Sequence, residues 1–239
     1  MILLYTDFGW RGPYVGQMHA AIRRTTPDVP LVDLMHDAPA FDPLAAGCLL
    51  AALASDWAPG SVVIAVVDPG VGSDRLPLAV QAGDCWLVGP DNGLLVAAAR
   101  ARDAAPAWHR IVWRPARLSA SFHGRDLFAP TGARLAEGDR TGLVPLDRAP
   151  VGRETPDELA AVVYVDGYGN VMTGLKPRPG AVLAAGRQRF AERRTFAEAA
   201  AGEAFWYKNA LGLAEIAVNQ GHAASRLGLS PGDAVAWAG

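Results

Sequence analysis

Residues 62–72 read VVIAVVDPGVG, an unbroken apolar run that ends in an Asp-Pro-Gly turn. Six consecutive apolar residues without alternation are typical of a strand buried on both faces, as in a parallel sheet covered by helices. Residues 2–5 are a shorter run of the same kind, and residues 31–34, LVDL, are expected to form the next strand. We therefore expect three strands in the first third of the chain, and the two at 2–5 and 62–67 are expected to be buried.

Helical patterns lie between these apolar runs. Residues 14–24 have helical spacing, and Pro13 precedes them in a position where its fixed φ suits a first turn. Asp42 followed by Pro43 is a typical helix start, and leucines at helical spacing come after it. Buried strands that alternate with helices predict an α/β fold, with a mostly parallel sheet inside an α/β/α sandwich.

Three strand ends are followed by Asp and Gly: TDFG at 6–9, VVDPGVG at 66–72 and LVGPDNG at 87–93. In open α/β sheets, ligands bind beyond the carboxyl ends of the strands. These polar, glycine-bearing segments therefore predict one shared pocket. A fourth segment, SFHGRDLFAP at 121–130, places His, Arg and Asp at the start of a helix.

The pattern changes at RAPVGRETPDE, residues 148–158, which is polar, contains prolines and is typical of a linker. Short apolar runs at close spacing follow, separated by turn signals such as DGYGN and SPGD. Such spacing predicts a small antiparallel sheet or β-barrel. We expect an N-terminal α/β/α domain over residues 1–150 and a smaller C-terminal antiparallel β-barrel domain over 159–239, joined by a linker at about 148–158.

The composition is that of a folded protein, with 51% hydrophobic and 19% charged residues among 239. A formal net charge of −2 provides no basic field for nucleic acid. The longest apolar stretch, 44–54, is far shorter than the roughly 20 residues of a membrane helix. The N-terminal MILLYTDFGW has no basic leader, and the two cysteines lack CxxC spacing. We expect a cytoplasmic protein without nucleic-acid or membrane partners.

Several common catalytic motifs do not match. TDFG is similar to the magnesium motif of kinases, but a kinase also needs a Gly-rich loop, a strand lysine and an HRD segment, which are missing. DPGVG and GPDNG have no nearby lysine, which argues against a triphosphate site. Acidic and His side chains at strand ends could bind a metal, but they lack HxxxH, HxH or DxD spacing, so no metal or cofactor is expected; they are Asp7, His36, Asp37, Asp68, His123 and Asp126.

Seven segments match one family in order and nearly from end to end: TDFG, VDLMHDAPAFD at 32–42, VVDPGVGSDR at 66–75, GPDNGLL at 89–95, FHGRDLFAP at 122–130, DGYGN at 166–170 and LAEIAVNQGHAA at 213–224. The chain resembles the adenosine-forming S-adenosyl-L-methionine (SAM) hydrolases, or SAM hydroxide adenosyltransferases, which are relatives of fluorinase and chlorinase. The resemblance implies an α/β/α domain, a β-barrel domain and a homotrimer with active sites between subunits. It also implies metal-free attack by water on the ribose 5′-carbon of SAM, giving adenosine and methionine.

The resemblance assigns roles to individual residues. It implies a catalytic set of Asp68, Arg75 and His123, and a ribose-binding Asp7. The resemblance also implies three groups of substrate contacts. His36 and Phe41 belong to a loop that borders the ribose, and the barrel pair Asp166 and Asn170 holds the methionine ammonium and the adenine edge. A late segment across the ligand contributes Tyr207, Asn209, Glu215 and Val218.

Two departures from the relatives bear on the reaction. The halogenating enzymes carry an uncharged residue where this chain has Asp68. A carboxylate there would repel a halide but accept hydrogen bonds from water, which favours hydrolysis. The Asn-Ser that often precedes the family's last glycine motif is Asn209-Ala210 here, so a hydroxyl contact to the methionine carboxylate is missing.

These residue types suit attack by water on a sulfonium. The departing methionine is neutral and needs no general acid, so catalysis depends on orienting the water. Asp68 and His123 can each accept its proton, with Arg75 holding Asp68 ionised, and the residues alone leave open which one does. Asp7 can accept from both ribose hydroxyls. The resemblance suggests that the off-configuration sulfonium epimer is the one cleared.

Four alternatives stay open at this stage. A SAM-dependent halogenase of the same family and a metal-dependent nucleosidase are rival enzymes. A SAM or adenosine sensor would bind without turnover. Without the resemblance, Asp68, Arg75 and His123 could also be a buried ion-pair network that braces two loops.

Overall fold

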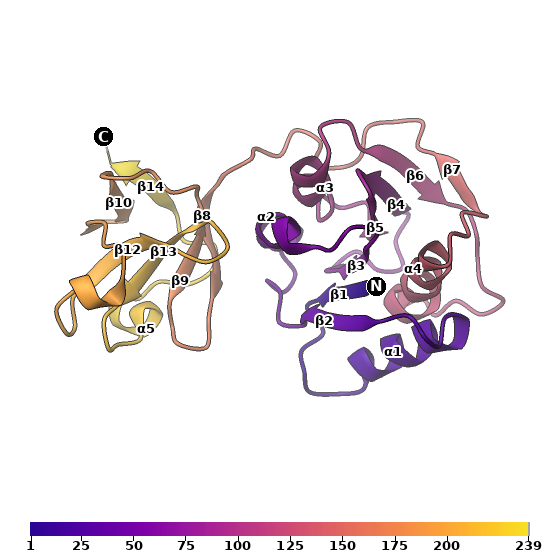
Figure 1. The fold of residues 1–239 in the computed structure, drawn as a ribbon, viewed down its shortest axis with the longest axis horizontal. Coiled ribbons are helices and arrows are strands. Elements are labelled where there is room, and N and C mark those ends of the chain that lie inside the picture. Colours follow the sequence, from indigo (N-terminus) through magenta and orange to yellow (C-terminus); the bar gives the residue numbers. More distant parts are fainter. Residues whose placement is uncertain (239) are drawn as a thin grey trace. The chain divides into compact units, whose positions relative to one another are not determined.

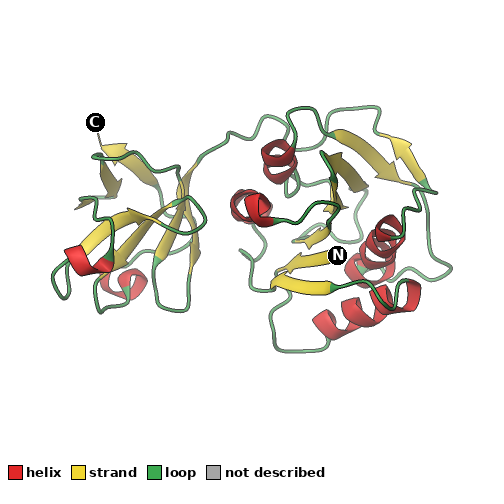
Figure 2. Ribbon diagram, in the orientation of Figure 1, coloured by secondary structure: helices red, strands yellow, loops and turns green. Residues whose placement is uncertain are grey.

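The computed structural model describes residues 1–238, which form two compact units that divide between Thr155 and Pro156 (Figure 1). The N-terminal unit holds a seven-stranded sheet and four α-helices, and the C-terminal unit holds two small antiparallel sheets and one α-helix (Figure 2). Within the described range, every helix is too short or too polar to cross a membrane.

The N-terminal sheet has the strand order β2-β1-β3-β5-β4-β6-β7. The pairs β2-β1, β1-β3 and β3-β5 are parallel, and the pairs β5-β4, β4-β6 and β6-β7 are antiparallel. In chain order the strands are Ile2–Thr6 (β1), Leu31–Met35 (β2), Val62–Val66 (β3), Pro77–Ala82 (β4), Cys85–Pro90 (β5), Ala107–Ile111 (β6) and Leu143–Pro145 (β7).

The α/β class is confirmed, but the expectation of a mostly parallel sheet is wrong, because the sheet is mixed. Ala82 and Cys85 face each other across a two-residue turn, Gly83-Asp84, in which Gly83 has φ +62°. Glycine followed by aspartate between two apolar runs is a hairpin signal, since glycine adopts positive φ without steric cost. With only two residues between β4 and β5, no crossover is possible and the strands must pair antiparallel.

Two helices cover each face of this sheet (Figure 1). Alternate residues of β3 point to opposite faces, so that Val62 and Ile64 pack in one core cluster and Val63 and Ala65 in the other. One face carries α1 (Tyr14–Thr25) and α4 (Ala129–Ala136); the other carries α2 (Pro43–Leu53), α3 (Val96–Arg102) and a 3₁₀ turn, Ala54–Asp56.

The segment from Arg148 to Thr155, which the sequence marks as linker, is fixed to the N-terminal unit. Arg148 pairs with the buried carboxylate of Asp91, whose other oxygen accepts from Val151 N–H at 2.8 Å. Arg100 donates to the carbonyl of Thr155 at 2.6 Å. The chain therefore leaves the N-terminal unit from a defined point.

The C-terminal unit has two sheets, which enclose the larger of its two core clusters. The four-stranded sheet has the order β12-β13-β9-β8, and the three-stranded sheet has the order β11-β10-β14. The elements are Leu159–Val165 (β8), Val171–Gly174 (β9), Val182–Ala185 (β10), Gln188–Phe190 (β11), a 3₁₀ turn Phe196–Glu198, Ala204–Lys208 (β12), Ala214–Val218 (β13), Ala223–Leu227 (α5) and Val235–Ala238 (β14).

The antiparallel character of this unit is confirmed, whereas a closed barrel is not. Among residues 156–238 the two sheets are connected by isolated bridges, Ala161 to Ala234 and Glu192 to Trp206. Closing a barrel requires continuous ladders with a fixed stagger between all neighbouring strands. The strands here are short, and they stop before such ladders form.

Candidate functional site

A candidate site in the N-terminal unit lies where the strand order reverses. β1 has β2 on one side and β3 on the other, and Asp7 and Asp68 follow the carboxyl ends of β1 and β3. Ligands of α/β sheets bind at such a switch point. A cavity of about 150 Å³ is found there, and its lining includes Asp7, Phe8, Phe41, Asp68, Phe122 and His123.

Asp68, Arg75 and His123, which the sequence predicts as the catalytic set, are in direct contact. Arg75 Nε donates to Asp68 Oδ1 at 2.7 Å, and Nη2 pairs with Oδ2. The same Nη2 lies 3.1 Å from His123 Nδ1. The guanidinium also stacks over the Phe128 ring, 5.3 Å from its centroid. Arg75 is thus immobilised behind the carboxylate and the imidazole.

These contacts determine the tautomer of His123. A guanidinium only donates hydrogen bonds, so His123 Nδ1 must accept and the neutral ring carries its proton on Nε2. Burial lowers the pKa of His123, and the positive charge of Arg75 lowers it further. The neutral ring is therefore favoured, with an N–H donor at Nε2.

The segment around His123 is held by close packing. His123 immediately precedes a π-helix, Gly124–Phe128, a form that often occurs at functional sites. A Cβ on Gly124 would lie 3.1 Å from the Phe8 ring, so a larger residue here would require the ring to shift by a few tenths of an ångström. Arg125 and Asp126, the other charged residues of this motif, bond to each other at 2.6 Å and brace the loop instead of lining the cavity.

Asp7 and Phe41 meet at the rim of the cavity. Asp7 Oδ2 accepts from Phe41 N–H at 3.4 Å, and burial raises the pKa of the Asp7 carboxyl. Phe41 has φ +61° and its side chain is 79% exposed. His36, predicted as a neighbour of the ribose, is instead fully buried, and its ring does not reach the cavity.

The third polar strand exit, LVGPDNG, does not line this cavity, so the expectation of one pocket shared by all three exits is wrong. Asn92 Nδ2 donates to the carbonyl of Val67 at 2.8 Å and supports the exit of β3. Asp91 holds the segment after β7, as described above. The motif is thus a brace for the site.

The C-terminal half of the predicted site begins at the DGYGN turn after β8. Asp166 Oδ1 accepts from the main-chain N–H groups of Tyr168 and Asn170 at 2.9 and 2.8 Å. Its Oδ2 accepts from Asn170 Nδ2 at 3.0 Å. Tyr168, at the tip, is 84% exposed. Both predicted residues of this turn are therefore held in one rigid loop.

Tyr207, Asn209 and Glu215 form a second connected group. Tyr207 and Glu215 face each other across β12 and β13, and the hydroxyl of Tyr207 donates to Glu215. Asn209 Nδ2 donates to the other carboxylate oxygen of Glu215 at 2.7 Å. Burial raises the pKa of Glu215, and the nearby charge of Asp166 adds to this. Val218 is separate from the group, because its side chain packs in the core cluster.

The aromatic wall of the N-terminal cavity is absent from the predicted site residues. The rings of Phe8, Tyr14 and Phe122 form a mutual cluster with centroids 5.4–6.1 Å apart. Phe8 and Phe122 belong to TDFG and FHGRDLFAP. Their positions next to Asp7 and His123 in these motifs could therefore indicate an aromatic lining of the cavity.

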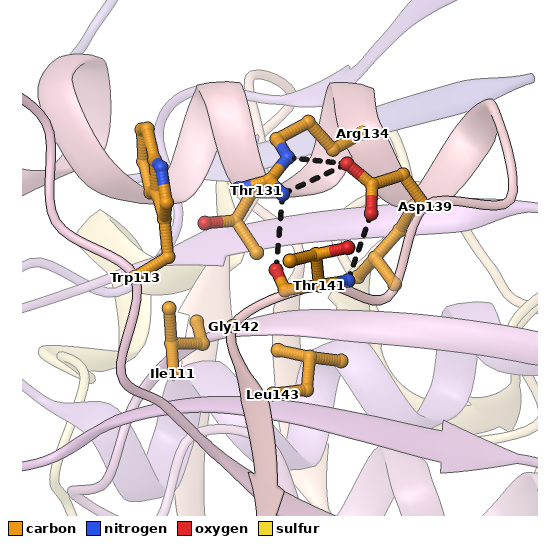
Figure 3. A pocket seen from close by; sticks show the side chains of 9 residues that line it. Ile111, Trp113, Thr131, Arg134, Asp139, Thr141, Gly142 and Leu143 are labelled. Atoms are coloured by element: carbon orange, nitrogen blue, oxygen red, sulfur yellow. Dashed lines mark hydrogen bonds and ion pairs between the residues drawn. The ribbon is translucent and has the colours of Figure 1, made fainter.

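Two further observations concern other parts of the described chain. A small cavity beside Thr131, Arg134 and Trp113 measures about 10 Å³, enough for one water molecule and far too small for a nucleoside (Figure 3). Across residues 1–238, His, Cys, Asp and Glu side chains nowhere gather in a group of three suited to hold a metal ion.

Comparisons with known proteins match the whole length of the chain. The model of the SAM hydroxide adenosyltransferase N-terminal domain matches residues 2–144, and that of the C-terminal domain matches 160–236. The (R)-S-adenosyl-L-methionine hydrolase of Salinispora tropica is 39% identical over 95% of this chain and 94% of its own. The protein of the same name from Thermus thermophilus is 36% identical over 97% and 96%. The crystal structure of an uncharacterized conserved protein from Thermotoga maritima superposes with a TM-score of 0.87 at 30% identity, covering 100% of both chains.

Proposed function

The chain belongs to the SAM hydroxide adenosyltransferase family, and we infer from this that it hydrolyses SAM to adenosine and L-methionine. The observation that carries the proposal is the Asp68–Arg75–His123 contact at the cavity that also holds Asp7. The curated relatives are named for the (R) substrate. We assign the (R)-sulfonium epimer to this chain as well.

The proposed reaction is attack by water on the 5′-carbon of the ribose. The water oxygen forms the new C–O bond, while the electron pair of the C–S bond leaves with sulfur as neutral methionine. The surplus proton of the attacking water passes to Asp68, whose carboxylate oxygens keep free lone pairs beside Arg75. His123 Nε2–H donates to the water oxygen and orients its remaining lone pair toward the carbon.

Asp7 is proposed to bind the ribose diol, and Asp7→Asn tests this. The amide keeps the shape but loses the charge, so adenosine affinity should fall by about 1.5–3 kcal/mol. Calorimetric titration with adenosine and 2′-deoxyadenosine measures the effect. Removal of the 2′-hydroxyl from adenosine should cost much less binding affinity in the variant than in the wild type. Equal losses of affinity in the two proteins would mean that Asp7 does not contact the diol.

The C-terminal group supplies the chemistry for the methionine end. Asp166 and Glu215 provide negative charge, and the Tyr207 proton is committed to Glu215, so its hydroxyl oxygen offers a lone pair to an ammonium. We propose that this group serves a site completed by the N-terminal unit of another subunit in a homotrimer. Phe41 and Tyr168 are strongly exposed, and they are the large side chains that such a contact would cover.

The function is tested by incubating the purified protein with each sulfonium epimer of SAM in EDTA. Equimolar adenosine and methionine from the (R) epimer are expected by chromatography. Adenine would instead indicate a nucleosidase, a 5′-halogenated adenosine formed with added halide would indicate a halogenase, and binding without products would indicate a sensor. The Asp68→Ala variant is the matched control for contaminating activity.

A further inference from the structure

The two loops that border Asp7 are joined by hydrogen bonds on both sides of His36. The N–H of Gly9 donates to the carbonyl of His36 at 2.6 Å, and the N–H of Ala38 donates to the carbonyl of Thr6 at 3.1 Å. Asp7 itself accepts from Phe41 N–H. The segment after β1 and the segment after β2 therefore form one bonded unit at the cavity rim.

Side chains complete this unit beneath the cavity. Thr6 Oγ1 accepts from Phe8 N–H at 3.2 Å and lies 2.8 Å from His36 Nδ1. His36 Nε2 lies 2.9 Å from Asp33 Oδ1. His19 Nε2 reaches the same carboxylate oxygen at 2.7 Å from α1. Thr6 and His36 are fully buried, so water cannot replace these partners.

The direction of each bond follows from its partners. Although burial works against it, the hydrogen bonds from His36 and His19 hold the pKa of Asp33 below its ordinary value. The ionised carboxylate only accepts, so His36 carries a proton on Nε2. When the His36 ring is neutral, Nδ1 is then the acceptor for the Thr6 hydroxyl, and the Thr6 oxygen accepts from Phe8 N–H. Asp33 thereby orients the His36 ring, the ring orients the Thr6 hydroxyl, and Thr6 holds the N–H of Phe8 in the main chain beside Asp7.

We propose that Thr6, His36 and Asp33 form a positioning network that holds Asp7 and Phe41 in the geometry that binds ribose. His36 thus acts on ligand binding without touching the ligand, which explains a site motif whose histidine is buried. The proposal rests on the proposed function, because it assigns the ribose to Asp7. It goes beyond that function because Thr6, His36 and Asp33 act on binding without contacting the substrate.

The test is Thr6→Val, which keeps the β-branched shape and removes only the hydroxyl. The adenosine dissociation constant should rise roughly tenfold, because Phe8 N–H and His36 Nδ1 lose their shared partner and the Asp7 turn relaxes. The ratio of 2′-deoxyadenosine to adenosine dissociation constants should fall toward one. Thr6→Ser restores the hydroxyl and should restore that ratio. Asp33→Ala, at a partly exposed residue, should lower the ratio as Thr6→Val does.

Ile111→Val is the control for a general loss of stability, because Ile111 is buried in the same unit outside the site. It should lower the unfolding temperature without changing the ratio. If both Thr6→Val and Asp33→Ala keep the wild-type ratio, the network does not position Asp7 and the proposal is wrong. Should Thr6→Val not fold, Asp33→Ala alone decides. A wild type that does not bind adenosine would overturn the assignment of the ribose to Asp7 and with it the network, whereas product formation from SAM tests the hydrolytic function separately.

Discussion

Turnover should fall by roughly two to four orders of magnitude when Asp68 is replaced by alanine, the range expected for loss of a general base. Arg75 would then keep a charge with no carboxylate to pair with, and the water would have no acceptor for its proton. Single-turnover measurement of adenosine release gives the rate, and adenosine titration provides the control, because Asp68 is not assigned to hold the product. Wild-type turnover in this variant would remove Asp68 from the mechanism.

His123 distinguishes donor from base within the same experiment. His123→Gln offers an amide N–H near the position of Nε2 but no basic nitrogen, whereas His123→Ala offers neither. His123→Ala is expected to lower the rate by about a hundredfold or more. If the imidazole donates to the water, His123→Gln should keep a large part of the rate that His123→Ala loses. Equal losses in the two variants would contradict the role of His123 as a hydrogen-bond donor to the water.

The pH profile gives an independent check on His123. Burial and the charge of Arg75 lower its pKa, so its neutral ring should persist below the roughly 6.5 of an ordinary histidine. Protonation at Nδ1 would oppose Arg75, so activity should be lost only as pH falls through that lowered pKa. His123→Gln should lack this acidic loss.

Local sequence signals predicted the first half of the fold because each one acts over a few residues. Asp42 caps α2 as expected, with its carboxylate accepting from Leu44 and Ala45 N–H at 3.1 and 3.0 Å. Buried strands were recognisable because both faces are covered. From β4 onward the sheet differs from the predicted one, because apolar runs do not encode the direction of a strand, whereas the Gly83-Asp84 turn does.

The site residues divide along a similar line. The resemblance places Asp68, Arg75 and His123 in one set, and they are in contact, because Asp68 and Arg75 share the loop between β3 and β4 while His123 reaches them from the start of the π-helix. Burial could not be predicted for His36 or Val218, since a polar or apolar letter in a motif does not state whether its side chain faces a ligand or the interior. The sequence does not indicate the contacts of Asp33, because they depend on β2 lying beside β1 and on α1 bringing His19 to the same carboxylate.

The second large effect is expected from combining two inactive chains. The predicted site residues fall into two sets, one in each compact unit: Asp68 belongs to the first and Asn170 to the second. Asp68→Ala and Asn170→Ala should each be nearly inactive alone. If each site is shared between subunits of a cyclic trimer, a head-to-tail interface pairs the N-terminal unit of one chain with the C-terminal unit of the next.

Co-expression of the two variants at equal levels should then recover activity. For random assembly, about one quarter of the interfaces should join two intact units, so activity should approach about one quarter of the wild type. The matched control combines Asp68→Ala with Asp7→Ala, two lesions in the same unit, which leaves every N-terminal unit defective and should recover nothing. Different affinity tags on the two chains allow mixed trimers to be isolated by sequential purification. A site contained within one chain would keep one lesion in every copy, so absence of recovery in verified mixed trimers would refute the shared site.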